Sequence, residues 1–283
     1  MDATIIYRYD LGMKAQSKAR ITITLRNDLL PRLDNFIDGE NIRNRSHAIE
    51  FILNQQLGVG IERAVILAGA DHNNVVHALT RIRKRATIEY TFELLKKFGI
   101  RDIIIVIDRY GDELRSFVGD GSQWGVHAQF AQDGESIGTA HALLAVKSQL
   151  KSSFMVIYSD TLVNLNLGDM VEHHEQNNLN ATVALTYRRS PEERYGVARM
   201  EGNKVLEYSE KPGKEGKHGL VNAGVYIFEP NIFDYISNDT QSIEKEVLPQ
   251  LAEQKQLTGY PFQGKWFDIA RDNDRKAAEN EWR

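Results

Sequence analysis

The sequence predicts an α/β fold in which helices cover both faces of a mostly parallel β-sheet. Residues Phe154–Asp160 read FMVIYSD, and the first five are apolar or aromatic without alternation, which is typical of a strand buried on both faces. Two similar apolar runs, AVIL at 64–67 and IIIVI at 103–107, precede it. Segments with helical periodicity separate these runs, and alternation of strand and helix predicts a layered α/β structure.

Composition limits the classes of function. The chain has 283 residues, of which 42% are hydrophobic and 26% charged, so it is long enough for one large domain and one small one. The formal net charge of −4 means that any contact with nucleic acid must be local. Cysteine is absent, which excludes disulfides and thiolate chemistry. No apolar run approaches the roughly 18 residues that span a bilayer, and no signal peptide is recognised, so we expect a cytoplasmic protein without a membrane partner.

The first sixty residues have a pattern of their own. Residues 1–18 form a polar arm with a basic end. Ala19–Leu25 (ARITITL) alternates strictly and predicts a strand with one apolar face. Asn27 can cap a first amphipathic helix, and Asn44 or Ser46 can cap a second. One strand and two helices cannot form a stable unit, because a single strand has no partner for its backbone groups.

The segments RITITL, NDLLPRLDNF and NRSHAIEFIL resemble, in this order, a ribbon-helix-helix DNA-binding domain at residues 19–59. The resemblance implies that the strands of two chains pair about a two-fold axis and enter the major groove, so we expect a homodimer or higher even oligomer and double-stranded DNA as a partner. By position, base edges would be contacted by Arg20, Thr22 and Thr24, and a phosphate would be held by the backbone amides of Arg45 and Ser46. The alternative is a ribbon that only dimerises the chain. Arg and Thr on the outer face favour DNA binding.

The predicted elements of the large domain, residues 62–283, follow one another as strand and helix. Gly69 allows a tight turn after the first strand, and Asp160 ends the central one. Carboxyl ends of strands in open α/β sheets meet the ligand, and an Asp there commonly holds a metal bound to phosphates; the alternative is an Asp that caps the next turn. The other elements expected are a helix at 87–98, a helix near 113–117, a strand near 126–130, and a helix at 139–150 opened by Gly138.

Ordered motifs from Ala64 to about Ala277 resemble the sugar-1-phosphate nucleotidyltransferases: AVILAGA, IEYTFELLKKFGI, GDGSQWGVHAQFAQ, GTAHALLAVKSQL, the strand ending in Asp160, YGVARMEGNKVLEYSEKP, LVNAGVYIFEP and WFDIARDND. The resemblance implies a Rossmann-like mixed sheet of the GT-A-like type, and transfer of a nucleotide from a nucleoside triphosphate to a sugar phosphate with Mg²⁺ and no organic cofactor.

The resemblance also assigns site residues. It implies Asp160 and Asp268 as magnesium ligands, Glu210, Lys211, Asn222 and Gly224 around the sugar and its phosphate, and Gly69, Gln132, Gly138 and Thr139 around the nucleotide. Each has a plainer alternative: Lys211 belongs to a Lys-Pro-Gly turn, Asn222 can satisfy loop backbone, and Asp268 can be one more solvated charge.

One part of the family pattern is missing. In that family a loop of the form G-G-x-G-T-R, followed by P-K-P, cradles the triphosphate. Here the segment reads LAGADHNNVVHALTRIRKRATIEY: Gly69 remains, Ala70 replaces the next glycine, and no Pro-Lys-Pro precedes Ile88. Because phosphoryl transfer depends on such positioned donors, we expect little activity and no catalytic residue. Four basic residues could replace the lost cations, or could form a basic surface or a second DNA contact: Arg81, Arg83, Lys84 and Arg85.

These observations together predict a DNA-binding transcriptional regulator, in which a catalytically degenerate nucleotidyltransferase-like domain senses a nucleotide sugar, sugar phosphate or nucleotide. A domain that keeps its product-binding residues without the catalytic loop suits a sensor. The alternative is an active sugar-1-phosphate nucleotidyltransferase that carries an autoregulatory DNA-binding domain.

Overall fold

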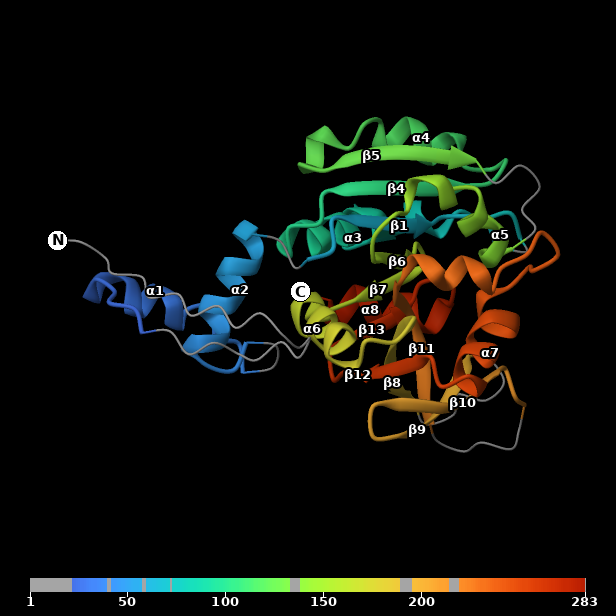
Figure 1. Cartoon of the computed structure of the whole chain (residues 1–283). Helices are drawn as coiled ribbons and strands as arrows, with labels where there is room; N and C mark the ends of the chain where they lie inside the picture. Colours follow the sequence, from blue (N-terminus) through green and yellow to red (C-terminus); the bar gives the residue numbers. More distant parts are fainter. Residues whose placement is uncertain are drawn as a thin grey trace.

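A computed structural model describes residues 22–39, 42–57, 60–71, 73–132, 138–188, 195–213 and 219–282. A mixed sheet of nine strands forms the centre of the large domain, and a small N-terminal pair of helices projects from one end (Figure 1). The predicted mixed α/β fold is confirmed. Among the helices that the structure describes, we find none with both the length and the apolar character needed to cross a bilayer.

The central sheet has a parallel half and a mostly antiparallel half. Its strand order is β5-β4-β1-β6-β11-β8-β12-β10-β9, and β9 also pairs with β11. The parallel half consists of β5 (His127–Gln132), β4 (Asp102–Ile107), β1 (Arg63–Leu67) and β6 (Phe154–Tyr158). The other half consists of β11 (Gly219–Phe228), β8 (Ala181–Arg188), β12 (Leu257–Pro261), β10 (Lys204–Glu210) and β9 (Gly196–Glu201). Only β12 and β8 are parallel in this half.

Burial on both faces explains the uninterrupted apolar strands. Phe154 to Ile157 of β6 are all buried. Val156 belongs to the core on one face of the sheet and Ile157 to the core on the other. The core that contains Ile157 includes the apolar stripes of α3 (Thr87–Lys97) and α6 (Leu167–Asn177), and the core that contains Val156 includes those of α5 (Thr139–Leu144) and α7 (Leu248–Glu253). The sheet is therefore covered by helices on both faces, as the sequence predicted.

Shorter elements complete the large domain. They are α4 (Asp112–Val118), α8 (Asp272–Glu281), the small sheets β2 (Arg81–Ile82) with β3 (Arg85–Ala86) and β7 (Thr161–Val163) with β13 (Trp266–Asp268), 3₁₀ turns at His77–Leu79, Ser122–Trp124, Lys147–Gln149 and Pro230–Asp234, and a π-helix at Ile243–Val247. The helix expected at 139–150 ends early, at Leu144. The chain turns there and buries Val146 and Leu150 in the core beside α5.

The N-terminal region does not show the predicted ribbon. Residues 22–26 have no strand assignment, and Thr22 and Thr24 are exposed, while Arg20 and the start of the predicted strand lie outside the described residues. A 3₁₀ turn at Asn27–Leu29 leads into α1 (Leu30–Asp34), and α2 (Arg45–Leu57) follows. Among the described residues no strand lies against 22–26, and an unpaired strand leaves its backbone groups without partners. A ribbon-helix-helix arrangement is therefore not shown.

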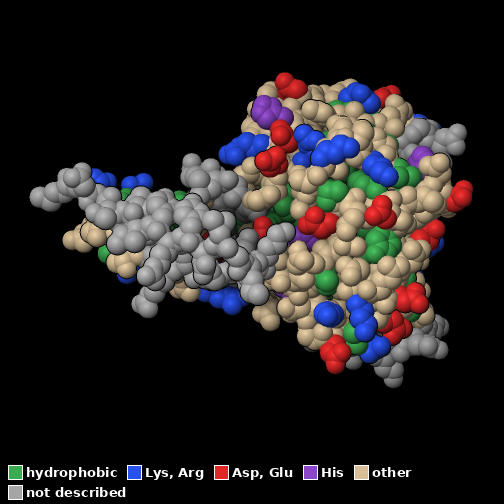
Figure 2. Space-filling model, in the orientation of Figure 1, with side chains coloured by type: hydrophobic (Ala, Val, Ile, Leu, Met, Phe, Trp, Pro, Cys, Tyr) green, Lys and Arg blue, Asp and Glu red, His purple; other side chains and the backbone are tan. Residues whose placement is uncertain are grey.

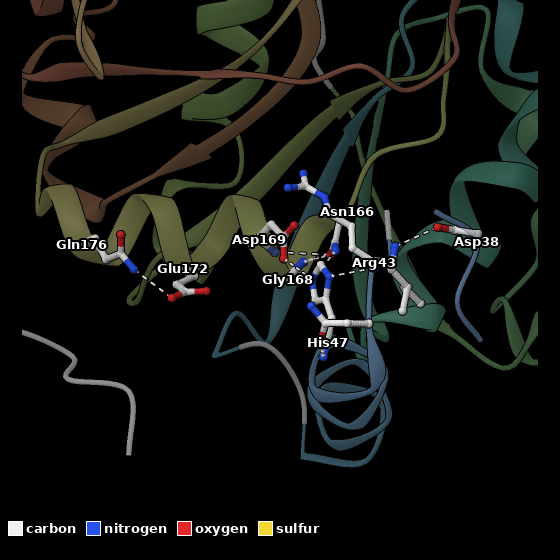
Figure 3. A network of polar contacts seen from close by, with 10 residues as sticks. Asp38, Arg43, His47, Asn166, Gly168, Asp169, Glu172 and Gln176 are labelled. Atoms are coloured by element: carbon white, nitrogen blue, oxygen red, sulfur yellow. Dashed lines mark hydrogen bonds and ion pairs between the residues drawn. The ribbon is translucent and has the colours of Figure 1, made fainter. Parts of the chain in front are cut away.

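The N-terminal helices pack directly on the large domain. The ring of Phe51 in α2 lies 5.9 Å from that of Phe36 and 5.7 Å from that of Phe98, at the end of α3. His47 Nε2 lies 2.9 Å from a carboxylate oxygen of Asp169 in α6, and Figure 3 shows this contact between the two helices. Leu33 and Phe51 are buried in the same core as the sheet, so the N-terminal helices and the large domain share one continuous hydrophobic core.

Candidate active site

Two adjoining cavities lie at the carboxyl ends of the parallel strands. The first has a volume of about 300 Å³ and contains residues that follow β1, β4 and β6. The second, of about 290 Å³, lies toward the antiparallel half of the sheet. Thr139, Tyr158 and Asp160 line both cavities. The carboxylate of Asp160, delivered by β6, therefore lies where the two cavities meet.

Asp268 lies beside Asp160 because two short strands pair. β13 ends at Asp268 and runs antiparallel to β7, so Asp268 is opposite Thr161, the residue after Asp160. The backbone N–H of Ile269 donates to the carbonyl oxygen of Asp160 at 2.7 Å. Burial, followed by the negative charges of Asp160 and Asp274, raises the pKa of Asp268 to about 7. Burial also raises the pKa of Asp160.

This pair of carboxylates suits a divalent cation. A partly buried acid whose pKa is raised by burial and by a neighbouring carboxylate, as that of Asp268 is by Asp160, binds a proton or a cation more readily than an isolated acid does. No group of three or more His, Asp and Glu side chains within the described ranges is arranged to hold a metal alone. Mg²⁺ is commonly bound by one or two carboxylates, with substrate phosphates and water as the remaining ligands. The residues therefore fit a magnesium ion that binds together with a phosphate.

The second cavity contains the sugar-side residues expected from the sequence. Glu210 and Lys211 lie next to each other on its wall, with Lys211 Nζ 3.6 Å from Glu210 Oε1. Burial raises the pKa of Glu210, and the charge of Lys211 opposes that shift. Gly224, with φ of 72°, also lines the cavity. A Cβ atom at this position would come within 2.7 Å of Thr161 Oγ1, so only glycine fits without rearrangement.

Asn222 is the centre of a buried hydrogen-bond network. Its Nδ2 group donates to the hydroxyl of Tyr208 at 2.9 Å and to that of Tyr226 at 2.6 Å. Its Oδ1 atom accepts from the N–H of Gly224 at 3.0 Å. Asn222 thus holds the backbone at Gly224 and two tyrosine side chains in place around the second cavity. The hydrogen bond to backbone that was considered as its alternative role is therefore present as well.

Sequence reasoning missed Glu244, a partly buried acid that lines the second cavity. Its carboxylate accepts from the hydroxyls of Thr139 at 2.9 Å, Ser242 at 2.8 Å and Tyr226 at 3.3 Å, and also from that of Tyr158. Burial raises its pKa. A Glu within a helical stretch, with no motif around it, has no distinguishing signal in a single sequence. Only the fold brings it to the cavity.

The loop after β1 is a compact turn around Asp71. Asp71 Oδ1 accepts from the N–H groups of Asn73 at 2.8 Å and Val75 at 2.9 Å, and Oδ2 lies 3.0 Å from His77 Nε2. Burial opposes ionisation of Asp71, but these contacts outweigh it, and they lower its pKa to about 2. Asp108, at the end of β4, anchors the start of the turn, because it accepts from the N–H of Ala70 at 2.8 Å.

The remaining nucleotide-side residues lie in different places. Gly69, Gly138 and Thr139 line the first cavity, with Thr139 also in the second. Gln132 is exposed at the end of β5 and lines neither cavity.

The proposed replacement cations also lie elsewhere. Arg83 donates from its side chain to the carbonyls of Glu279 and Asn280 in α8, and Arg85 pairs with Glu93 of α3. None of Arg81, Arg83, Lys84 and Arg85 lines either cavity. The basic cluster therefore does not replace the missing loop, and Arg83 and Arg85 instead hold the β2–β3 hairpin against α8 and α3.

The side chain of Arg45, one of the two residues whose backbone amides were predicted to hold a DNA phosphate, is engaged within the chain. Arg45 forms a two-point contact with Asp34, at 2.7 and 2.8 Å. At the start of α2, the side chain of Asn44 accepts from the N–H of His47 at 3.0 Å, so it caps the helix terminus that was expected to bind phosphate. On the face shown in Figure 2, acidic and basic side chains are intermixed over the large domain.

The chain is similar in sequence to a known protein family and to named enzymes of it. The family model described as "Nucleotidyl transferase" matches residues 50–278. The chain is 30% identical over 225 residues to a mannose-1-phosphate guanylyltransferase catalytic subunit beta of Drosophila pseudoobscura pseudoobscura, a match that covers 75% of this chain and 60% of that protein. It is 30% identical over 203 residues to the mannose-1-phosphate guanyltransferase of Yarrowia lipolytica, a match that covers 69% of this chain and 55% of that protein. The chain thus spans about 55–60% of the length of these relatives.

Solved structures share the fold. A putative glucose-1-phosphate thymidylyltransferase from Bacillus anthracis, in complex with a sucrose, has a TM-score of 0.69 at 24% identity, with coverage of 77% of this chain and 93% of that one. A UDP-glucose pyrophosphorylase complexed with UDP-glucose has a TM-score of 0.68 at 21% identity, with coverage of 78% and 98%. At these identities the likeness establishes the fold alone.

The comparisons overturn the main functional prediction. The relatives and structures named above are nucleotidyltransferases by name, and none of them is named as a DNA-binding protein. The prediction of a transcriptional regulator with a catalytically degenerate sensor domain is wrong, and double-stranded DNA is withdrawn as a partner. The findings instead favour the alternative of an active enzyme. Judging activity from one missing loop motif gave too little weight to the rest of the site, which is assembled from several strands.

Proposed function

Because the chain belongs to the nucleotidyl transferase family, we propose that it is an active sugar-1-phosphate nucleotidyltransferase. A phosphate oxygen of the sugar 1-phosphate attacks the α-phosphorus of a nucleoside triphosphate. The bond between that phosphorus and the oxygen bridging to the β-phosphate breaks, and pyrophosphate leaves with the electron pair. The products are a nucleoside diphosphate sugar and pyrophosphate.

The observation that carries this proposal is the position of Asp160 between two cavities. A transfer between two substrates needs two adjoining pockets, with the reacting groups held at their common edge. Asp160 lines both cavities, and Asp268 lines the second at the same edge. We assign the first cavity to the nucleotide and the second to the sugar phosphate.

The side chains of the second cavity suit a sugar phosphate. Lys211 supplies a positive charge for the phosphate. Glu210 offers carboxylate oxygens that can accept hydrogen bonds from sugar hydroxyls. Glu244 holds the hydroxyls of Thr139 and Tyr158 at the edge shared by the two cavities. Asn222 holds Gly224 and two tyrosines in place around the ring. The network orients the sugar 1-phosphate toward the edge at Asp160.

Asp160 and Asp268 would hold Mg²⁺ at that edge. When bound, the ion would neutralise charge on the phosphates as the reaction proceeds. The paired β7 and β13 strands keep the two Asp side chains close together before substrate binds. Little reorganisation of the site is therefore required when the phosphates bind.

The names of the relatives suggest which substrates to test first. Two curated relatives at 30% identity are named mannose-1-phosphate guanylyltransferase or guanyltransferase. We therefore propose mannose 1-phosphate and GTP as the first pair. The reaction is proposed for the large domain, residues 62–283.

Pyrophosphate release tests the proposal. Purified protein is incubated with Mg²⁺ and a matrix of nucleoside triphosphates and sugar 1-phosphates. We expect release with at least one pair, its loss in Asp160→Asn, and its retention in Asp239→Asn, a matched change at an exposed Asp of the described chain that lines neither cavity. Absence of product from every pair, with a folded protein, would refute the enzymatic function.

For the N-terminal region we propose a fold only. The arrangement of α1 and α2 after an alternating segment supports a ribbon-helix-helix arrangement over residues 19–59, following an arm at 1–18. Hydrogen exchange of backbone amides in the full chain tests it, because residues 21–25 would be protected only if they form a paired strand. Free exchange throughout this segment would exclude the ribbon.

A further inference from the structure

The first cavity is strongly acidic for a site assigned to a triphosphate. Asp71, Asp108 and Asp160 line it, and no Lys or Arg does among the described residues. A nucleoside triphosphate carries several negative charges, and unscreened like charges repel one another strongly inside a protein. Asp108 is occupied by the backbone N–H groups of Ala70 and Tyr110, each at 2.8 Å. The cavity therefore needs a positively charged donor besides any magnesium.

His77 is the one side chain of the described lining that can carry a positive charge. It is 5% exposed, and its Nε2 atom lies 3.0 Å from Asp71 Oδ2. Its Nδ1 atom is buried and has no hydrogen-bond partner among the residues that the structure describes. A buried polar atom without a partner is unusual, because it gives up its hydrogen bonds with water without replacing them. Nε2 of the imidazole is thus engaged by Asp71, and Nδ1 is left without a hydrogen-bond partner among the described residues.

The position of the imidazole is set from two sides. Asp71 is itself held by the N–H groups of Asn73 and Val75, so it cannot swing away. His77 begins a 3₁₀ turn whose last hydrogen bond joins the N–H of Thr80 to the carbonyl of His77. With Nε2–H donated to Asp71, a charged imidazole has an Nδ1–H group left to donate.

We propose that His77 donates a hydrogen bond from Nδ1 to the triphosphate of the nucleotide, with Asp71 as its positioning residue. The pair supplies a positively charged donor beside a turn that lacks the glycine-rich motif. Nδ1 is closed to solvent in the free protein, so the contact requires the ring to shift, with the bond from Nε2 to Asp71 kept, when a phosphate oxygen arrives. This inference rests on the proposed function, because it assigns the first cavity to the nucleotide.

Calorimetric titration of the full chain with three probes tests the contact. The probes are GTP and inorganic tripolyphosphate, each with Mg²⁺, and guanosine. His77→Phe keeps a ring but has no polar atom in it. We expect this substitution to lower the affinity for GTP and for tripolyphosphate by about tenfold to a hundredfold, the usual range for a hydrogen bond with a charged group. Guanosine affinity should not change. His77→Lys should restore much of the tripolyphosphate affinity, which a purely structural role would not predict.

Controls separate the contact from a folding defect. His173→Phe removes a partly buried imidazole that contacts Thr258 and lines neither cavity, and it should bind all three probes as the unsubstituted chain does. Asp71→Asn should weaken tripolyphosphate less than His77→Phe. Thermal unfolding of each variant verifies that it is folded.

Several outcomes would overturn the contact. The first is that His77→Phe binds GTP as tightly as the unsubstituted chain does. The second is that His77→Phe loses affinity for GTP and for guanosine by the same factor. The third is that the unsubstituted chain binds neither GTP nor tripolyphosphate. The proposed function fails separately: a chain that binds tripolyphosphate through His77 but releases no pyrophosphate with any substrate pair keeps the contact and loses the enzymatic assignment.

Discussion

Replacing Asp268 by Asn is expected to make the metal-free protein more stable at neutral pH. Burial and the neighbouring charges of Asp160 and Asp274 raise the pKa of Asp268 to about 7, from an ordinary value of 3.8. The folded state therefore binds more protons than the unfolded state between these two values. By linkage, the stability that the neutral acid provides is fully present below about pH 4 and is lost as the pH rises through about 7.

The size of the effect follows from the shift. Each pH unit between about 4 and 7 costs about 1.4 kcal/mol of unfolding free energy. The full interval corresponds to about 4 kcal/mol, and because Asp268 is partly exposed, solvent screening reduces the expected loss to about 2–3 kcal/mol. Asn is neutral at every pH and avoids this loss, so the stability difference between Asp268→Asn and the unsubstituted chain should grow with pH and level off above about pH 7.

Urea denaturation in EDTA, at intervals from pH 5 to 8, measures this difference. Asp239→Asn, at an exposed position of the large domain, serves as the control and should show no such trend. Added Mg²⁺ together with a nucleoside triphosphate, without EDTA, should stabilise the unsubstituted chain at pH 7.5 but have a much smaller effect on Asp268→Asn, because ligand binding to the native state raises its stability. A stability difference that is constant from pH 5 to 8 would refute the assignment of a shared acidic site.

Three further substitutions test the site and the N-terminal packing. Asp160→Asn should lower the rate of pyrophosphate release at least about a hundredfold, since it removes a carboxylate common to both cavities; an unchanged turnover number would contradict its role. Asn222→Ala leaves the hydroxyls of Tyr208 and Tyr226 without their shared donor, so it should cost about 1–3 kcal/mol and raise the KM for sugar 1-phosphate more than that for nucleotide. Phe51→Ala removes a buried ring that contacts Phe98, and chemical denaturation should show a loss of about 3 kcal/mol; an unchanged midpoint would mean that the N-terminal helices are not coupled to the large domain.

Local patterns were sufficient for most of the large domain. The apolar runs at 64–67, 103–107 and 154–158 predicted β1, β4 and β6, because strands buried on both faces contain few polar residues. The helical stripe at 87–98 predicted α3 for a similar reason, since its apolar positions recur with the helical period. By contrast, the alternating segment 19–25 did not give a strand over its described residues. Alternation of apolar and polar residues predicts which side chains can share a face. A strand also requires a second strand whose backbone N–H and C=O groups pair with its own.

Inference from one missing motif was less successful. The loss of the glycine-rich loop was visible in the sequence, and it led to the wrong prediction of a degenerate sensor. The same segment contains Asp71 and His77, and their pairing could not be recognised before the turn between them was known. The four basic residues that follow were considered as replacements, yet none of them lines either cavity, and the side chains of Arg85 and Arg83 contact α3 and α8. A basic residue in the sequence does not show which way its side chain points.

The sequence by itself determined the order of strands and helices in the large domain and the placement of Asp160 at the end of a buried strand. These properties depend on residues that are neighbours in the chain. The resemblance implied that Asp268 and Asp160 share a site, and the tertiary structure supplied the pairing of β7 and β13 that brings them together. Only the tertiary structure decided that Glu244 enters the second cavity and that α2 packs on the large domain. Each of these depends on contacts between segments far apart in the chain, and such contacts are selected by the packing of the whole core rather than by any local pattern.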